Sequence, residues 1–287
     1  MKNFKLKSYC KINLTLKVLK KLRNGNHSIG SLITFCNLYD VINISSIKST
    51  KDKISFFGKF SYGINSKKNT ITQVIYLLRK KKLLKNKCFK IDLKKNIPHG
   101  SGLGGGSSNA ATLLNYFNLK MKLGLSKNKL QKIAGKIGFD VPISLEKKNT
   151  FLTGKKDEIL RIKKRFGLNL LIVYPNIICS TKKIYKENKK IGLSRDKIDF
   201  KTKNGKKFID YLKNEHNDLE SAAVKIYPII KKLINFIKLQ KGCHLSRITG
   251  SGSSCIGIFS NMRNAIYAQK LIKLKYPKYW SAVSKTI

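Results

Sequence analysis

The sequence predicts a mixed α/β (α+β) protein of two domains, and three observations support this prediction. Short apolar segments with period-two alternation, typical of strands, occur together with longer segments whose apolar residues have helical spacing. The chain has 287 residues, which fits one large domain or two of ordinary size. The pattern of strands and helices restarts after about residue 155. We therefore expect one domain over residues 1–155 and a second over residues 156–287.

The elements of the first half follow from local patterns. Apolar and polar residues alternate over 12–18, which predicts a strand, and Asn24-Gly25 is a typical hairpin turn. Apolar spacing predicts a helix over 71–78, with Asn69 or Thr70 as its N-cap. The remaining strands are expected at 32–38, 41–44, 54–57 and 88–93, and two more helices at 110–117 and 130–137.

The second half shows fewer clear patterns. A strand is expected over 168–174, and a lysine-rich stretch without periodicity follows at about 186–207. A single helix is expected over 219–236, because apolar residues recur there at helical spacing. A strand over 256–259 and a helix over 265–271 complete the chain.

The composition is strongly basic. There are 61 lysines and arginines against 14 acidic residues, for a formal net charge of +47, and seven of the basic residues are arginines. The hydrophobic content of 41% excludes a disordered chain. The lysines are spread along the whole sequence, so compositional drift and a polyanionic partner are both open explanations. An RNA-binding protein would need a basic, aromatic-rich sheet motif or an arginine patch, and the sequence shows neither.

The sequence also gives expectations about location and cysteine chemistry. No apolar stretch reaches the roughly 18 residues of a membrane span, and lysines interrupt the N-terminal apolar segment. None of the six cysteines forms a C-x-x-C pair, which favours buried thiols in a reducing compartment. We therefore expect a soluble cytoplasmic protein that does not associate with membranes.

A glycine-rich loop between a strand and a helix is the most informative stretch. Its backbone N–H groups and the following helix N-terminus predict an anion site, and a flexible linker would not open an amphipathic helix. No lysine follows Gly106, which excludes a Walker A loop, and the acidic residue of a dinucleotide fold is missing from 115–130. The expected phosphate-binding residues are Pro98, Gly100, Ser101, Gly102, Leu103, Gly104, Gly105, Gly106, Ser107 and Ser108.

This loop resembles the phosphate loop of the GHMP small-molecule kinases, and five further motifs occur along the chain in the family's order. They are 10–14 (CKINL), 25–27 (GNH), 138–142 (GFDVP), 217–220 (NDLE) and the Gly-Ser-Gly loop within 249–254 (TGSGSS). The resemblance covers nearly the whole chain. It implies the two-domain GHMP fold, with an N-terminal ribosomal-protein-S5-like domain and a C-terminal ferredoxin-like α+β domain.

The resemblance also implies a reaction and its participants. The SSNAA form of the loop is similar to the branch that uses ATP and Mg²⁺ to phosphorylate the 2-hydroxyl of cytidine diphosphate methylerythritol. In that case Asp140 is the base that accepts the hydroxyl proton, and Lys11 polarises the hydroxyl. The alternation at 12–18 leaves Lys11 and Asn13 on one strand face, away from an apolar face that packs. The sequence does not assign protein ligands to the Mg²⁺.

The remaining site residues also follow from the resemblance. Asn69 and Lys95 match positions near the adenine, and His27 matches a histidine that contacts the cytosine edge. Asn26 replaces an aromatic that stacks on the base, so only Tyr185 is expected to stack. Phe139 replaces an alanine beside Asp140. The expected substrate residues are Asn13, His27, Thr181, Tyr185, Gly250 and Gly252.

Two alternatives remain beside this interpretation. One is another GHMP kinase, of the homoserine or mevalonate type, although the glycine-x-histidine element and the SSNAA loop favour the cytidine branch. The other is the basic RNA-binding protein. The expected partners are small molecules rather than a specific nucleic acid, and the expected state is a monomer or a weak homodimer.

Overall fold

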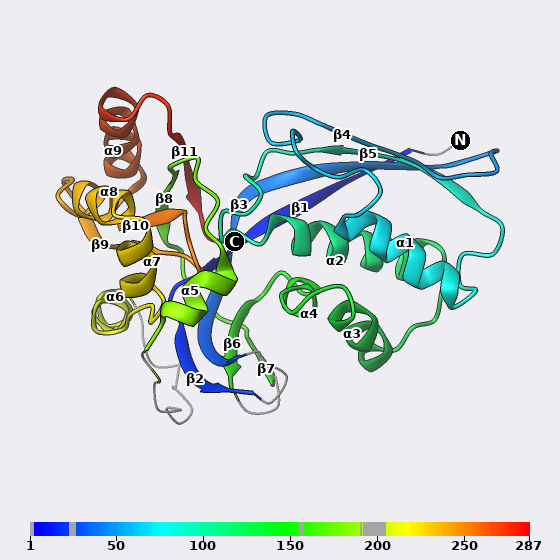
Figure 1. The fold of residues 1–287 in the computed structure, drawn as a ribbon, viewed down its shortest axis with the longest axis horizontal. Coiled ribbons are helices and arrows are strands. Elements are labelled where there is room, and N and C mark those ends of the chain that lie inside the picture. The colour runs from blue at the N-terminus through cyan, green and yellow to red at the C-terminus, as the bar shows by residue number, and fades with distance from the viewer. Residues whose placement is uncertain (1–2, 23–26, 155–157, 190, 192–204) are drawn as a thin grey trace. The chain divides into compact units, whose positions relative to one another are not determined.

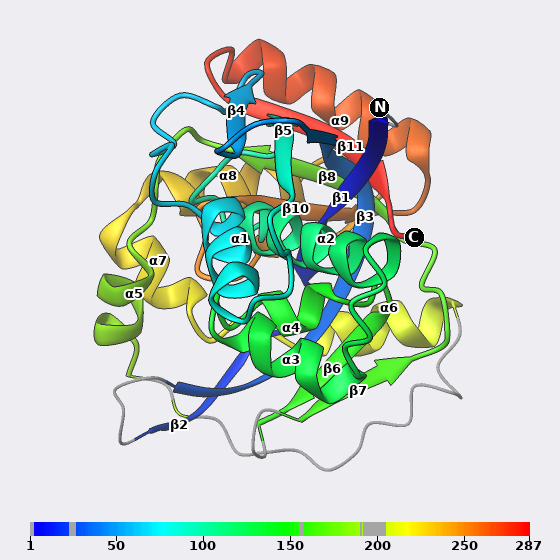
Figure 2. The ribbon, with the colours of Figure 1, turned by 90° about the vertical axis from the view of Figure 1, so that its right-hand side faces the viewer.

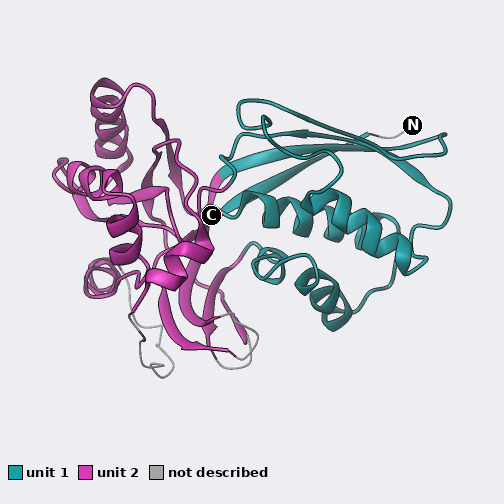
Figure 3. Ribbon diagram, in the orientation of Figure 1, with its two compact units in different colours: residues 1–11, 38–99, 104–147 teal, residues 12–37, 100–103, 148–287 magenta. Residues whose placement is uncertain are grey.

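The computed structural model describes residues 3–22, 27–154, 158–189, 191 and 205–287. The described chain divides into two compact units, and each combines strands with helices (Figures 1 and 3). Unit 1 comprises residues 1–11, 38–99 and 104–147, and unit 2 comprises residues 12–37, 100–103 and 148–287. The expected mixed architecture is confirmed.

Unit 1 consists of a sheet with helices against one of its faces. Two of its strands are complete, β4 (Lys53–Phe57) and β5 (Cys88–Lys94). The other two extend into unit 2: unit 1 contains β1 (Asn3–Asn13) as far as residue 11 and β3 (His27–Ile47) from residue 38 onward. Strand β3 pairs with β1 and runs antiparallel to β5, and β5 runs parallel to β4. The helices are α1 (Thr70–Lys80), α2 (Gly105–Lys120), α3 (Lys127–Gly135) and α4 (Val141–Ser144).

The core of unit 1 forms where these helices cover the sheet. Helices α1 and α2 lie side by side (Figure 2), and their apolar faces pack with residues of β3 and β5. Phe89 on β5 and Phe117 on α2 are fully buried and meet edge to face, with ring centroids 4.9 Å apart. This packing fixes α2, and therefore its N-terminus, against the sheet.

Unit 2 contains two sets of strands and five helices in its described part. The strands are β2 (Lys17–Lys21), the first part of β3, β6 (Asn149–Thr153), β7 (Ile159–Ile162), β8 (Asn169–Tyr174), β9 (Cys243–Ile248), β10 (Cys255–Phe259) and β11 (Trp280–Lys285). The helices are α5 (Thr181–Glu187), α6 (Gly205–Asn214), α7 (Glu220–Ile226), α8 (Ile229–Lys238) and α9 (Met262–Lys275).

Four strands of unit 2 form an antiparallel sheet in the order β11–β8–β10–β9. Apolar side chains of this sheet and of α7, α8 and α9 make one buried cluster, which includes Leu171, Leu233 and Ala268. A helix-covered antiparallel sheet agrees with the α+β arrangement expected for the C-terminal domain.

The division into units differs from a single cut near residue 155. Residues 12–37 and 100–103 group with the C-terminal half. The physical reason is pairing, because residues 30–33 of β3 are hydrogen-bonded to β6, while residues 41–47 of the same strand pair with β5. The expected boundary itself lies among residues 155–157, outside the described residues.

Several predicted elements are corrected by the structure. The strand expected over 12–18 spans the end of β1 and the start of β2, and the strands expected at 32–38 and 41–44 are one strand, β3. The helix expected over 219–236 is two helices, α7 and α8. Its interruption lies at Tyr227-Pro228, because proline cannot donate the backbone hydrogen bond that a continuous helix requires.

Two further expectations concern the thiols and the membrane. Five cysteines are buried and Cys243 is half-buried. Burial raises the pKa of Cys179 and of Cys243 to about 11, so these thiols are protonated at neutral pH.

Within the described ranges, every helix is too short or too polar to cross a membrane.

Candidate active site

The glycine loop leads directly into α2. Gly104 is the N-cap of this helix and has a φ of 66°, a left-handed conformation that glycine adopts without strain. Gly105 and Gly106 form the first turn of the helix, together with Ser107 and Ser108. The first N–H groups of a helix have no acceptor within it, so this turn presents donors to an anion.

Lys11 packs against this helix start. A Cβ atom at Gly104 would lie 2.5 Å from Cγ of Lys11, so only glycine allows the lysine stem to pass so close. The Lys11 ammonium forms an ion pair with Asp140, with 3.2 Å between Nζ and Oδ2. The Lys11 side chain is 6% exposed and that of Asp140 is 36% exposed. Unit 1 therefore brings together the glycine loop exit, Lys11 and Asp140.

Hydrogen bonds hold Asp140 in position relative to α2. Asp140 precedes the short helix α4, and its carbonyl accepts hydrogen bonds from the backbone N–H and the hydroxyl of Ser144. The Ser108 hydroxyl donates to Ser144 Oγ at 3.3 Å. The Asp140 carboxylate makes no capping bond to its own helix. Phe139 is 72% exposed, so its bulk is directed to solvent.

The strand that carries Lys11 is buried on both faces, whereas the sequence pattern predicted one packed and one open face. Lys11 and Asn13 are buried, and so are the apolar residues Cys10 and Ile12. Both faces of this strand end are thus covered, rather than one face packed and one open. A buried lysine requires a partner for its charge, and Asp140 supplies one.

Asn69 and Lys95, both expected near the adenine, already have extensive internal contacts. Asn69 is the N-cap of α1 and forms a capping box with Thr72, which confirms its expected capping role. Lys95 is 3% exposed and forms an ion pair with the fully buried Asp40. The Lys95 ammonium also lies close to the start of α2, because a Cβ at Gly105 would be 3.5 Å from it.

In unit 2, two glycine loops contact each other through their backbones. A Cβ atom at Gly102 would lie 2.3 Å from the carbonyl oxygen of Thr249 and 2.9 Å from that of Gly252. The backbone N–H of Ser254 donates to the Ser101 carbonyl at 3.1 Å. Glycine at position 102, with a φ of 82°, is therefore required by the close approach as well as by its conformation.

Asn13 and Asn217 connect the second glycine loop to the rest of unit 2. The Asn13 backbone N–H donates to Thr249 Oγ1 at 2.9 Å, and its side-chain amide donates to Ser31. The Asn217 amide donates to the carbonyl of Gly250 at 2.8 Å. These bonds fix the loop that contains Gly250 and Gly252.

His27 and Tyr185 form an aromatic pair in unit 2. Their ring centroids are 4.7 Å apart and the planes differ by 26°, so the rings stack directly on each other. Thr181, one turn before Tyr185 on α5, shares a hydrogen bond with Ser251 of the second glycine loop at 2.9 Å. The expected turn at Asn24-Gly25 and the replacement at Asn26 lie outside the described residues.

The protonation of His27 is shifted by its surroundings. Desolvation lowers the pKa of His27 below its ordinary value, and the charge of Lys21, its partner across the β2–β3 pair, lowers it further. The imidazole is therefore neutral at pH 7, with one nitrogen that donates and one that accepts a hydrogen bond.

The sequence analysis missed several residues that organise these groups. Asp40, Ser144 and Asn217 are buried and hold site residues by hydrogen bonds. Asn217 lies in the NDLE motif at 217–220, to which the family resemblance assigns no role here. Ser144 and Asp40 lie in segments with no distinctive spacing, so nothing in the sequence pointed to them. No group of three or more His, Cys, Asp or Glu side chains suited to a metal is present in the part of the chain that the structure covers.

Comparison with known proteins agrees with this geometry. Residues 69–148 match the GHMP kinases N terminal domain, and residues 197–276 match the GHMP kinases C terminal domain. A crystal structure of 4-(cytidine 5'-diphospho)-2C-methyl-D-erythritol kinase has the same fold, with a TM-score of 0.78, 20% identity, and coverage of 98% of this chain and 99% of that one. A homoserine kinase from Cytophaga hutchinsonii also shares the fold, with a TM-score of 0.70, 15% identity, and coverage of 100% and 95%.

Sequence relatives identify one branch of the GHMP kinase family. The 4-diphosphocytidyl-2-C-methyl-D-erythritol kinase of Pelagibacter ubique is 40% identical over 100% of both chains. The enzyme of the same name from Wolbachia pipientis wMel is 33% identical over 98% of this chain and 97% of its own. The chain belongs to the GHMP kinase family and, within it, to the family of these 4-diphosphocytidyl-2-C-methyl-D-erythritol kinases.

Proposed function

We propose that the chain transfers the γ-phosphoryl group of ATP to the 2-hydroxyl of 4-diphosphocytidyl-2-C-methyl-D-erythritol. The observation that carries this proposal is the Lys11–Asp140 ion pair beside the N-terminus of α2. It combines a proton acceptor, a fixed positive charge and a phosphate-binding helix start within one unit. The names of the sequence relatives supply the substrate.

Asp140 is the proposed base. Its carboxylate accepts the proton of the substrate 2-hydroxyl while the hydroxyl oxygen forms a bond to the γ-phosphorus of ATP. The bond between that phosphorus and the oxygen bridging to the β-phosphate breaks, and ADP leaves. The carboxylate suits this role because it is partly exposed and makes no capping bond to its own helix.

Lys11 is the proposed electrostatic partner of the reaction. Its stem passes Gly104 and its ammonium is paired with Asp140, so it can stabilise negative charge on the reacting oxygen and on the transferred phosphoryl group. Because the Lys11 stem is buried, the charge is fixed before the substrate arrives and does not have to reorganise during the reaction.

The first turn of α2 is the proposed phosphate site. Its N–H groups and helix dipole favour the β- and γ-phosphates, and Ser107 is the more exposed of the two serines because Ser108 is buried against Ser144. Mg²⁺ bound with ATP would neutralise phosphate charge, and the Ser107 hydroxyl is the group suited to contact it. Pro98 and Asn69 remain proposed contacts at the nucleotide end, and Lys95 is proposed to support that end, since its ammonium is paired with Asp40.

The cytidine end of the substrate is assigned to unit 2. His27 is neutral and can both donate to and accept from the cytosine edge, and Tyr185 offers a ring face for stacking. Asn13, Thr181, Gly250 and Gly252 are the proposed contacts to the diphosphate. We further expect small molecules as the partners, a cytoplasmic location, and a monomer or a weak homodimer.

A phosphoryl-transfer assay tests this function. Purified chain is incubated with ATP, Mg²⁺ and 4-diphosphocytidyl-2-C-methyl-D-erythritol, and separately with homoserine or mevalonate, while ADP formation is followed. We expect turnover only with the cytidine substrate. Turnover with homoserine or mevalonate in its place would overturn the proposal in favour of another GHMP activity.

Asp140→Asn tests the base within the same assay. We expect turnover to fall by about 10³-fold or more, in the range of a lost general base or nucleophile activator, while ADP binding stays intact. Glu146→Gln is the matched control, because Glu146 forms an ion pair with Lys127 in the same unit at 3.0 Å and has no proposed chemical role. Retained turnover in Asp140→Asn would remove Asp140 as the base.

A further inference from the structure

A single buried carboxylate in unit 1 collects four hydrogen-bond donors. Asp40 on β3 is fully buried, and its Oδ2 accepts from the Lys95 ammonium and from the Asn109 amide at 3.0 Å. Its Oδ1 accepts from the backbone N–H groups of Asn96 at 2.7 Å and Ile97 at 2.9 Å. A charge so deeply buried requires this degree of pairing, and the loss of any donor would leave it poorly satisfied.

These donors lie immediately before and after the glycine loop in sequence. Asn96 and Ile97 lead directly into Pro98, where the loop begins. Asn109 lies in the second turn of α2, just beyond the end of the loop. The Ile97 side chain also lies under the helix start, because a Cβ at Gly105 would be 3.0 Å from it. The same carboxylate therefore ties the entry of the loop to its exit.

The contacts of Asn109 and Lys95 support the same conclusion, because both side chains are held by Asp40. Asn109 is 2% exposed and its Oδ1 has no hydrogen-bond partner among the described residues, so the bond to Asp40 is what orients its amide. The Lys95 ammonium is turned toward Asp40 rather than toward solvent. Its charge is thus neutralised within the protein beneath the start of α2.

We propose that Asp40 is the positioning residue of the phosphate loop. It sets the place of the α2 N-terminus by holding both ends of the loop, and it keeps Lys95 in a supporting position beneath the helix. It contacts no substrate itself. This inference rests on the proposed function only in taking the first turn of α2 as the phosphate site.

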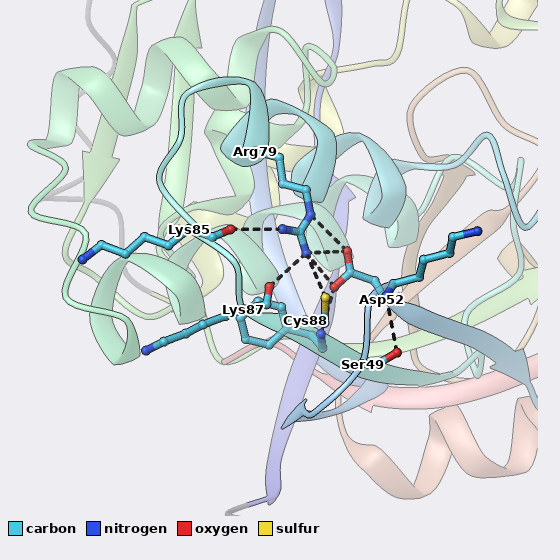
Figure 4. A network of polar contacts seen from close by, with 8 residues as sticks. Ser49, Asp52, Arg79, Lys85, Lys87 and Cys88 are labelled. Atoms are coloured by element: carbon cyan, nitrogen blue, oxygen red, sulfur yellow. Dashed lines mark hydrogen bonds and ion pairs between the residues drawn. The ribbon is translucent and has the colours of Figure 1, made fainter.

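Unit 1 contains a second carboxylate that accepts several hydrogen bonds, the half-buried Asp52, which serves as a control. Asp52 accepts a hydrogen bond from the Arg79 guanidinium at 2.8 Å (Figure 4) and another from the Phe89 backbone at 2.8 Å. Arg79 also donates to the carbonyl oxygens of Lys85 and Lys87. This network links the end of α1 to the start of β5, whereas Asp40 holds the other end of β5.

The experiment compares Asp40→Asn with Asp52→Asn in the full chain. Melting temperature measures stability, and titration calorimetry with ADP measures nucleotide binding without any turnover. Both variants should melt at a lower temperature, because each weakens the hydrogen bonds to a carboxylate that is shielded from water, fully at Asp40 and partly at Asp52. Only Asp40→Asn should weaken ADP binding, by about 10-fold or more, because only this variant releases the two ends of the glycine loop. The KM for the cytidine substrate should stay unchanged in both variants.

Asn109→Ala keeps the inference testable if Asp40→Asn does not fold. It removes only the donor on α2 and leaves Lys95 paired with Asp40. We expect weaker ADP binding with a small change in melting temperature. Wild-type ADP affinity in Asn109→Ala, or in a folded Asp40→Asn, would overturn the positioning role. A wild-type chain that binds ADP but does not phosphorylate the cytidine substrate would overturn the proposed function alone.

Discussion

The two units gather different kinds of chemistry. In unit 1, the groups beside the glycine loop are charged and paired, as in Lys11–Asp140 and Lys95–Asp40. In unit 2, the proposed substrate contacts are a neutral histidine, an aromatic ring and two glycine loops joined by hydrogen bonds. Phosphoryl transfer requires fixed charge, and recognition of a base requires ring faces and hydrogen-bonding edges. Substitutions in unit 1 should therefore lower kcat, and substitutions in unit 2 should raise the KM for the cytidine substrate.

After Asp140→Asn, the largest effect is expected from Lys11→Met. The change keeps much of the buried stem but removes the charge, so we expect kcat to fall by about 10²–10³-fold with little change in the KM for the cytidine substrate. Steady-state kinetics measures both quantities. Lys127→Met, which breaks an exposed ion pair with Glu146, is the control and should behave as wild type. A higher KM with unchanged kcat would contradict the assigned division between the units.

Gly104→Ala should give the next largest effect. It places a Cβ 2.5 Å from the Lys11 stem, and displacement of a catalytic group by about 1 Å can cost about 10²-fold in rate. Gly124→Ala is a matched control, because Gly124 has a φ of 63° but nothing within 4 Å of the added Cβ. Both variants should lose about 1–2 kcal/mol of unfolding free energy from the left-handed backbone. If both variants lost kcat equally, backbone strain rather than contact with Lys11 would be the cause.

Tyr185→Ala should affect binding in unit 2. Loss of a stacking ring costs roughly 1–3 kcal/mol, so we expect the KM for the cytidine substrate to rise by about 10-fold while kcat changes little. Tyr185→Phe keeps the ring and should retain wild-type kinetics. Equal KM values for the alanine variant and wild type would show that the cytosine does not stack on this residue.

His27 should give the smallest effect, visible in its pH dependence. Its pKa in the folded chain lies below its ordinary value of 6.5, so the unfolded chain binds the proton more readily. The free energy of unfolding should therefore fall as pH drops below 6.5, and the contribution should be complete above it. Denaturant unfolding of wild type and His27→Gln between pH 5 and 7.5 tests this. Parallel pH profiles would contradict a lowered pKa at His27.

The sequence predicted the glycine loop, its helix and the Asn69 cap because each has a local physical signature. The family motifs predicted Lys11 and Asp140 as site residues, and in the structure the two form an ion pair beside the end of the loop. The burial of Lys11 on a strand covered from both faces was not predictable, because period-two alternation gives only the two faces and not what covers them. Asp40 was not predictable for a similar reason, since its four donors lie 55 to 69 residues further along the chain.

Strand pairing accounts for most of the errors in the fold. Nothing between residues 38 and 41 marks whether β3 continues, and its continuation depends on β5 and β6 as partners. The break between α7 and α8 was overlooked because apolar spacing continues across Pro228. Helix periodicity alone does not register a missing backbone donor.

The discontinuous units have a consequence for the order of folding. Unit 2 needs residues 12–37 from the beginning of the chain, and Cys36 forms a β-bridge with Thr286 near its last residue. During synthesis this unit must wait for the C-terminal residues before its pairing is complete, and contacts so distant in sequence slow folding. A gene cut between residues 147 and 148 would therefore keep unit 1 whole in the first fragment but would separate residues 12–37 and 100–103 from the rest of unit 2, so the second fragment would not be an independent domain.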